Sequence, residues 1–264
     1  MIQLTRDRSR VPAAFTGAGH VANEGRLRRQ LPAREFTFSS AVWKKAKPRL
    51  RRESAGKCAY CESATEAVAH GDVEHFRPKS VYWWLAYCYD NYLFACQICN
   101  ESYKGDRFPV AAARMRVPRA SASSRPGGLG PDPTDAAAVA RFLERCAAEK
   151  PLLADPYAID PEPLFRWTAD ETLGEVRIEP RPRVGYVRRQ AATTITELGL
   201  NREELLFWRF RHYMILSGFR LVIVKAAGLA RDVAVDRVRW LMEGEQPYAA
   251  MARYFVREKW SLPV

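Results

Sequence analysis

Residues 71–80, GDVEHFRPKS, join a carboxylate directly to a histidine and follow the couple with a proline and two cations. Two Cys-x-x-Cys pairs bracket this stretch, one before it and one after it: Cys58, Cys61, Cys96 and Cys99. Four thiolates in two such pairs are the ligand set of a tetrahedral zinc site that has no open position for substrate. The sequence therefore predicts a structural Zn²⁺ ion that ties together the ends of the segment holding Glu74 and His75.

The cysteine pattern has one alternative interpretation. Four buried thiols can pack as small apolar groups, although two such spacings rarely occur together in that case. Cys88 and Cys146 have no partner at ligand spacing, so we expect both in the core.

The composition is that of an ordinary soluble globular protein, with 264 residues, 47% of them hydrophobic and 27% charged. No apolar run approaches the ~20 residues of a membrane-spanning helix. The first residues lack the apolar core of a secretory signal. We therefore expect a cytoplasmic protein without a membrane partner, and in that compartment paired cysteines indicate metal ligands rather than disulfides.

The net charge of +12 is unevenly distributed along the chain. Residues 1–52 carry 13 Lys and Arg against 3 Asp and Glu, residues 53–180 carry 14 against 19, and residues 181–264 carry 15 against 8. Two basic ends favour a polyanionic partner, of which nucleic acid is the commonest. The alternative is a basic surface that serves solubility or an acidic protein partner.

The predicted elements indicate an α+β fold. Residues 1–52 are typical of a basic arm, irregular over its first part, followed by a short helix for which Ser40 is the expected N-cap. Residues 53–115 hold the cysteines and the Glu-His couple, and we expect them to form a compact unit of their own.

The second half of the chain is expected to be mainly helical. Residues 116–134 are rich in Ser, Gly and Pro and are predicted to be a linker. Residues 135–264 come next, with a β-hairpin near residues 164–179 where apolar and charged residues alternate. Asn201 and Glu204 have the spacing of a capping box and predict the start of a long helix.

Aromatic side chains are frequent between the Glu-His couple and the second cysteine pair: Tyr82, Trp83, Trp84, Tyr87 and Tyr89. We expect them to pack against the helical region rather than to stack on bases. The apolar stripes of the C-terminal helices are likewise expected in the core.

Two stretches, EHFRPKS and DNYLFACQICNESYKG, resemble the HNH (ββα-metal) endonucleases, and the two cysteine pairs are similar to the zinc-stabilised branch of that family. Together with LLADPYAIDPEPLFRW and TTITELGLNREEL further on, the chain resembles the nuclease subunit of Septu-type anti-phage defence systems. The resemblance covers about residues 55–110, and more weakly extends to about residue 206. It implies a small ββα-metal core with a structural zinc site made of four cysteines.

The resemblance also implies a role for each motif residue. His75 matches the general base that activates a water molecule, and Asn91 matches the residue that orients this base. Glu74 and Asn100 match the ligands of a catalytic Mg²⁺ or Mn²⁺ ion. Glutamate stands where the wider family commonly has aspartate, and asparagine stands where other branches have histidine, so oxygen atoms would hold the ion.

The cations near the motif match phosphate contacts: Lys79, Lys104 and Arg107. The resemblance implies DNA cleavage that leaves 5′-phosphate and 3′-hydroxyl ends, and an ATPase subunit that controls it. RNA stays open as a substrate because this chemistry attacks the backbone. Two alternatives also stay open, namely a zinc-knuckle module that binds nucleic acid without cutting it, and a stand-alone restriction or toxin nuclease.

Overall fold

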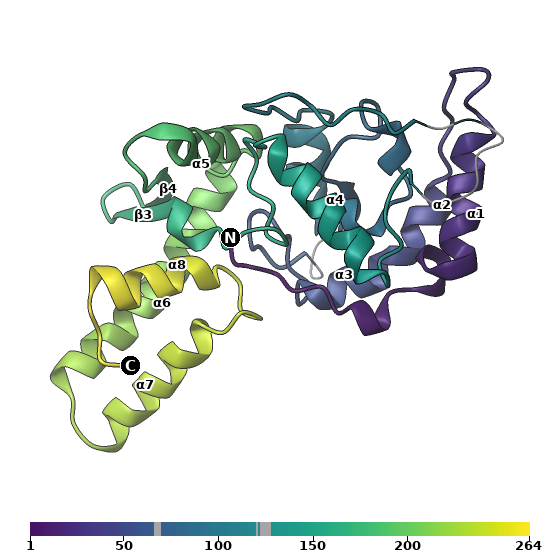
Figure 1. Ribbon diagram of the computed structural model, residues 1–264. Coiled ribbons are helices and arrows are strands. Elements are labelled where there is room, and N and C mark those ends of the chain that lie inside the picture. Colours follow the sequence, from purple (N-terminus) through teal and green to yellow (C-terminus); the bar gives the residue numbers. More distant parts are fainter. Residues whose placement is uncertain (66–69, 120, 122–127) are drawn as a thin grey trace.

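The computed structural model describes residues 1–65, 70–119, 121 and 128–264. The N-terminal half, which runs from purple to teal in Figure 1, lies on one side, and the green and yellow C-terminal elements lie on the other. Helices and two small antiparallel sheets make up these residues, as an α+β fold requires. Among the described residues, no helix is both long and apolar enough to cross a membrane.

The first sheet carries the Glu-His couple. Strand β1 (Asp72–His75) pairs antiparallel with β2 (Tyr92–Ala95), so that Glu74 lies opposite Leu93 and His75 opposite Tyr92. A π-helical segment, η6 (Ile98–Lys104), comes directly after β2. The strand, strand and helix thus follow one another in the order that the resemblance implies, and all four residues of β2 are buried.

The N-terminal region is more regular than the sequence predicts. Helix α1 (Gly17–Arg28) lies within the part expected to be an irregular arm, and one face of it is buried. The amide of Asn23 donates to the carbonyl of Ala14, and Leu27 is 1% exposed. The expectation of an irregular arm was wrong because these contacts come from tertiary packing, which the Gly- and Arg-rich sequence of α1 does not indicate.

The predicted basic helix is present but interrupted. It consists of α2 (Ser40–Trp43), a 3-10 turn η3 (Lys44–Ala46) and α3 (Lys47–Glu53), with Pro48 in the first turn of α3. The N-cap is Ser39 rather than Ser40, and its side chain makes no capping hydrogen bond.

The predicted linker is only partly described, since residues 120 and 122–127 lie outside the described residues. Its last part, from residue 128 onward, is attached to α1. A carboxylate oxygen of Glu24 accepts a hydrogen bond from the backbone N–H of Leu129 at 2.9 Å, and Asp132 accepts one from the N–H of Gly17 at 2.6 Å. Leu129 is 2% exposed, so this end of the segment is part of the folded protein.

The remaining elements are mostly helical. Asp135 caps α4 (Ala136–Ala148), and the predicted hairpin is formed by β3 (Phe165–Asp170) and β4 (Glu175–Pro180). The other elements come in chain order: α5 (Gly185–Glu197), α6 (Glu203–Lys225), α7 (Leu229–Leu241), α8 (Ala249–Arg253) and the π-helical η8 (Tyr254–Lys259).

The predicted capping box at the start of α6 is wrong. The N-cap is Arg202, and no side chain caps the helix. The side chain of Asn201 instead brackets the backbone of Ile178, accepting from its N–H and donating to its C=O, each at 2.9 Å. Asn201 therefore attaches the helix to the β3–β4 hairpin.

Two clusters of buried side chains form the core. The larger extends from Met1 to Phe255 and includes β1, β2 and the hairpin, whereas the smaller lies between α6, α7 and the C-terminal residues. Several apolar side chains of α6 are nevertheless exposed, contrary to the expectation for this stripe: Phe207, Trp208, Met214, Ile215, Leu221 and Val224.

The aromatic cluster packs mainly against the N-terminal region. Trp83 stacks on Phe36, with ring centroids 4.1 Å apart, and Tyr87 stacks on Trp43 at 6.3 Å. Tyr82 contacts the second half of the chain, because its hydroxyl donates a hydrogen bond to Glu149, the residue that follows α4. The expected packing against the helical region is therefore correct only in part.

Candidate active site and cysteine cluster

The four predicted zinc ligands lie together. The Sγ atoms of Cys58, Cys61, Cys96 and Cys99 are all within 4.8 Å of one another, and those of Cys61 and Cys96 are 4.0 Å apart. Tetrahedral zinc with Zn–S bonds of about 2.3 Å places its sulfur atoms about 3.8 Å apart. The four cysteines could thus hold one zinc ion. The backbone N–H of Ala59, inside the first pair, donates to the carbonyl of Phe94 on β2 at 2.9 Å, and the second pair follows directly after β2.

The four thiols of the cluster differ in pKa, because burial and their mutual hydrogen bonds act on each of them differently. Burial raises the pKa of Cys58, whereas hydrogen bonds from the neighbouring thiols lower the pKa of Cys61. The guanidinium of Arg202 donates to the sulfur of Cys99 at 3.5 Å, and its charge contributes to the lowered pKa of Cys61, whereas hydrogen bonds among the thiols and burial hold the pKa of Cys99 well above its usual range. Arg202 precedes α6 and lies far away in the sequence, so spacing alone gave no indication of this contact.

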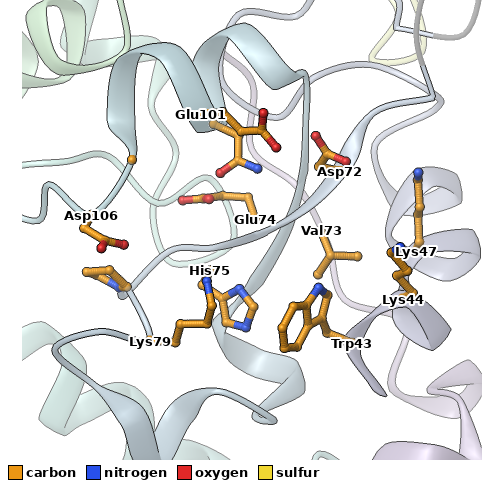
Figure 2. Close-up of a pocket in the computed structure, with 13 residues that line it drawn as sticks. Trp43, Lys44, Lys47, Asp72, Val73, Glu74, His75, Lys79, Glu101 and Asp106 are labelled. Carbon is orange, nitrogen blue, oxygen red and sulfur yellow. The ribbon is translucent and has the colours of Figure 1, made fainter. Parts of the chain in front are cut away.

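A cavity of about 430 Å³ opens beside β1 and η6. Figure 2 shows the Glu74 and His75 side chains in it, with acidic and basic side chains around them. Glu74, His75, Lys79 and Asn100 all line this cavity, so the structure brings four of the predicted site residues together.

Glu74 is buried and already has a cationic partner. Its carboxylate lies 2.6 Å from the ammonium nitrogen of Lys104 and accepts a hydrogen bond from the hydroxyl of Tyr60 at 3.3 Å. Burial raises the pKa of Glu74, and the Lys104 charge and these hydrogen bonds oppose that rise. Lys104 therefore stabilises the ionised carboxylate, the form that binds a metal ion.

A hydrogen bond from one ring nitrogen and contacts with two aromatic rings hold His75 in one orientation. Its Nε2 lies 3.0 Å from the carbonyl oxygen of Ala86, and because a carbonyl only accepts, Nε2 carries the proton and Nδ1 is free to accept one. Trp43 and Tyr92 each meet the imidazole edge-on, with ring centroids 5.1 and 5.0 Å away.

This burial also sets the charge of His75. Burial lowers its pKa to about 4, with Lys79 and Lys104 contributing in the same direction. The imidazole is therefore neutral near pH 7, which is the state that a general base needs.

The same cavity offers a set of oxygen ligands for a divalent ion. Asp72 and Glu74 are two residues apart on β1 and so share a face of the strand, and Asn100 comes from η6. One carboxylate oxygen of Asp72, Oδ2, is buried without a hydrogen-bond partner among the described residues. Carboxylate and amide oxygens suit Mg²⁺ or Mn²⁺, and an unpaired buried oxygen is what such an ion would satisfy.

Asn91 does not touch the histidine ring. Its amide instead brackets Arg77, accepting from the Arg77 N–H and donating to the Arg77 C=O, each at 2.9 Å. Its own carbonyl accepts from the N–H of Phe76. Asn91 thus fixes the chain immediately after His75, whereas the carbonyl of Ala86 is the hydrogen-bond partner of the ring itself.

Two of the three predicted phosphate contacts are placed elsewhere. Lys104 is 1% exposed and lies against Glu74 and the carbonyl of His75, so it has no free surface for a phosphate. Arg107 is half exposed but forms an ion pair with Glu197 of α5 at 2.8 Å, and it does not line the cavity. Lys79 lines the cavity as expected.

Several cavity residues were not predicted, and they come from both sides of the motif: Trp43, Lys44, Lys47, Asp72, Glu101 and Asp106. The sequence predicts that the basic residues 44–52 lie in a short helix, but the position of this helix beside His75 depends on tertiary packing. Asp72 has the alternate-residue spacing with Glu74 that a strand requires, and this spacing could have indicated it.

The comparison with curated proteins finds a partial relative. Over 89 residues the chain is 35% identical to the Septu protein PtuB of Bacillus mycoides (strain KBAB4). The match covers 29% of this chain, which spans only 30% of that protein's length. No protein-family model and no solved structure matches the chain. The similarity to a Septu protein thus concerns part of each chain.

Proposed function

We propose that the chain is a metal-dependent endonuclease of the HNH type that acts in anti-phage defence. The observation that carries the proposal is one cavity lined by Glu74, His75 and Asn100, on a strand–strand–helix unit beside a four-cysteine cluster. These three residue types in this arrangement supply a general base and oxygen ligands for a divalent ion. The partial similarity to a Septu protein supports the defence role.

His75 would take the proton from the attacking water. Its Nδ1 is free because Nε2 is held by Ala86, and burial between Trp43 and Tyr92 keeps the ring neutral and fixed. After accepting a proton, the imidazolium would be stabilised by the carbonyl of Ala86, which also accepts from the hydroxyl of Tyr92 at 2.7 Å. Orientation of the base before the reaction lowers the barrier without a further ordering step.

Glu74, Asn100 and Asp72 would hold the divalent ion. When bound, a Mg²⁺ or Mn²⁺ ion supplies stabilisation of the negative charge that develops on the phosphate and the leaving oxygen. Lys104 opposes the rise that burial causes in the pKa of Glu74, and it holds this carboxylate in place from the side away from the solvent. The structural zinc would fix the spacing between β1 and η6, the two elements that carry the ligands.

DNA is the proposed substrate, and an ATPase subunit of a defence complex is the proposed partner. The basic ends of the chain favour a nucleic acid. The exposed apolar side chains of α6, among them Phe207, Trp208 and Ile215, are the kind of surface that another protein covers. We propose that the ATPase subunit docks there and controls cleavage.

The test compares plasmid cleavage by the zinc-loaded protein and by His75→Ala in the presence of Mg²⁺ or Mn²⁺, with and without the proposed ATPase subunit. We expect cleavage by the wild type and a loss of about 10²-fold or more in His75→Ala, the usual contribution of a general base. His70→Ala is the matched control, because His70 is exposed and does not line the cavity. DNA binding without cleavage by any variant would instead establish a non-catalytic binding module.

A further inference from the structure

We propose that Lys44 and Lys47 form a phosphate-binding wall of the cavity and contact the DNA backbone next to the cleavage site. The inference rests on the proposed nuclease function and adds substrate contacts from the helical segment that borders the cavity. These lysines lie outside the strand–strand–helix unit, on η3 and at the start of α3.

The helical segment that carries them is firmly placed beside the candidate base. Val42, Ala46 and Leu50 are buried at 7%, 0% and 0% exposure, so one face of residues 40–53 is in the core. Trp43 lies edge-on to the ring of His75, and the ammonium of Lys79 lies 5.7 Å from the centroid of the Trp43 ring. Trp43 therefore connects the segment both to the base and to the cation already expected at the cavity.

The three-residue spacing of Lys44 and Lys47 places both on one face of the segment. Both line the cavity, whereas their neighbour Lys45 is exposed and does not. Figure 2 shows Lys44 and Lys47 on the same side of the cavity as Trp43, with Asp106 on the opposite side. Two of the three lysines in residues 44–47 therefore line the cavity, and Lys45 does not.

The charges of Lys44 and Lys47 are not part of an ion pair within the described part of the chain. Among the described residues, no carboxylate lies within 4.0 Å of the ammonium group of Lys44, Lys47 or Lys79, although acidic side chains line the same cavity. Arg49, further along the segment, differs because it pairs with Asp7 at 2.9 Å and with Glu53 at 3.2 Å. Arg49 is therefore paired with carboxylates of the protein, whereas Lys44 and Lys47, which line the cavity, have no carboxylate within 4.0 Å among the described residues.

Acidic and basic groups in one cavity that do not pair with each other indicate a ligand carrying both signs of charge. A phosphodiester with its divalent ion is such a ligand. Its phosphate oxygens suit lysine, and the ion suits the carboxylates on β1. Lysine contacts to phosphates position the backbone and carry no base information. We therefore expect binding through this wall to be independent of DNA sequence.

The experiment measures DNA binding by the full zinc-loaded chain in a His75→Ala background, so that cleavage does not interfere. Fluorescence anisotropy of a labelled duplex of about 20 bp is followed from about 50 to about 300 mM salt for this protein, for Lys44→Gln with Lys47→Gln, and for Lys45→Gln. Each phosphate contact contributes about 0.9 to the salt slope. We expect the double variant to lower the slope by about 1.8 and to weaken binding on the order of 50-fold at about 0.1 M salt. Lys45→Gln should change binding less than about 3-fold, because an exposed cation away from the cavity contacts no phosphate there.

Equal losses in the double variant and in Lys45→Gln would overturn the inference, and so would wild-type binding by the double variant or no binding by any protein. Thermal melting of each variant checks that the fold is retained, and Lys44→Arg with Lys47→Arg should restore binding. Failure of the nuclease proposal has a different signature. In that case the protein with intact His75 does not cleave the plasmid, but the differences in DNA binding between the lysine variants remain. With active protein, the double variant should raise KM more than it lowers kcat.

Discussion

A buried ion pair holds the chain that leaves the candidate base, and replacing its acidic partner measures how much this contact stabilises the fold. The carboxylate of Glu149 accepts from the guanidinium of Arg77 at 2.7 Å, from the hydroxyl of Tyr82 at 2.6 Å and from the N–H of Met115 at 2.7 Å. The Arg77 and Glu149 side chains are only 4% and 1% exposed. Glu149→Gln keeps the size of the side chain but leaves the guanidinium buried without a counter-ion.

Breaking a buried pair by removing one partner costs about 3–5 kcal/mol. For a chain of this size each kcal/mol lowers Tm by roughly 2–4 °C, so we expect a decrease of about 6–20 °C for Glu149→Gln. The matched control is Glu197→Gln, which removes the partner of Arg107 in a pair whose side chains are 26% and 55% exposed. An exposed pair contributes up to about 1 kcal/mol, so the control should lose no more than about 4 °C.

The assay is thermal unfolding measured by circular dichroism at fixed zinc concentration, with all three proteins at the same pH and salt. A Tm for Glu149→Gln within about 2 °C of the wild type, or equal to that of Glu197→Gln, would rule out this role for the pair. Either result would mean that Arg77 finds solvent or another acceptor and that the ion pair does not hold this part of the chain.

Zinc removal and three substitutions have equally definite expected outcomes. Chelation of zinc should release about one ion per chain, measured with a metallochromic dye, and should unfold the region around β1; release of no ion would contradict the cysteine cluster as a metal site. Gly199→Ala should destabilise the fold by more than about 2 kcal/mol in urea titrations, because Gly199 has a φ of +55° and a Cβ there would overlap the Tyr103 ring. Gly218→Ala should instead leave the stability unchanged or raise it by about 0.5–1 kcal/mol, since Gly218 lies in α6 with open space around it. A Gly218→Ala protein less stable than Gly199→Ala would contradict the backbone conformations described for both glycines. Asn91→Ala removes both hydrogen bonds to the Arg77 backbone and should lower the cleavage rate with DNA affinity unchanged; a wild-type rate would exclude a positioning role for Asn91.

The parts of the site that could be predicted are those whose spacing in the sequence reflects direct contact. The Cys-x-x-Cys pairs and the Glu74–His75 couple lie on or beside one short pair of strands and the helix after it. Alternation along β1 and the turn of η6 then decide which side chains meet, and both follow from local geometry. Local patterns also predicted the mainly helical character of the second half and the β3–β4 hairpin.

The parts that could not be predicted depend on distant contacts. Lys104 matched a phosphate contact, but the nearby buried carboxylate makes it the partner of Glu74. Asn201 had the right neighbours for a capping box, yet the backbone of Ile178 offers it two hydrogen bonds instead of one. Arg202 contacts Cys99 although 103 positions separate them in the sequence. A local pattern contains no information on any of these partners.

The proposal of metal-dependent catalysis at the Glu74–His75 cavity is tested by the dependence of plasmid cleavage on Mn²⁺ concentration, compared between the wild type and Glu74→Gln. We expect the cleavage rate of the wild type to rise with Mn²⁺ to saturation. In Glu74→Gln the rate should fall by about 10²-fold or more, or need far more Mn²⁺, because an anionic ligand has become a neutral amide. Wild-type cleavage that persists after the divalent ions are removed, or the same Mn²⁺ dependence in both proteins, would contradict a metal ion held by Glu74.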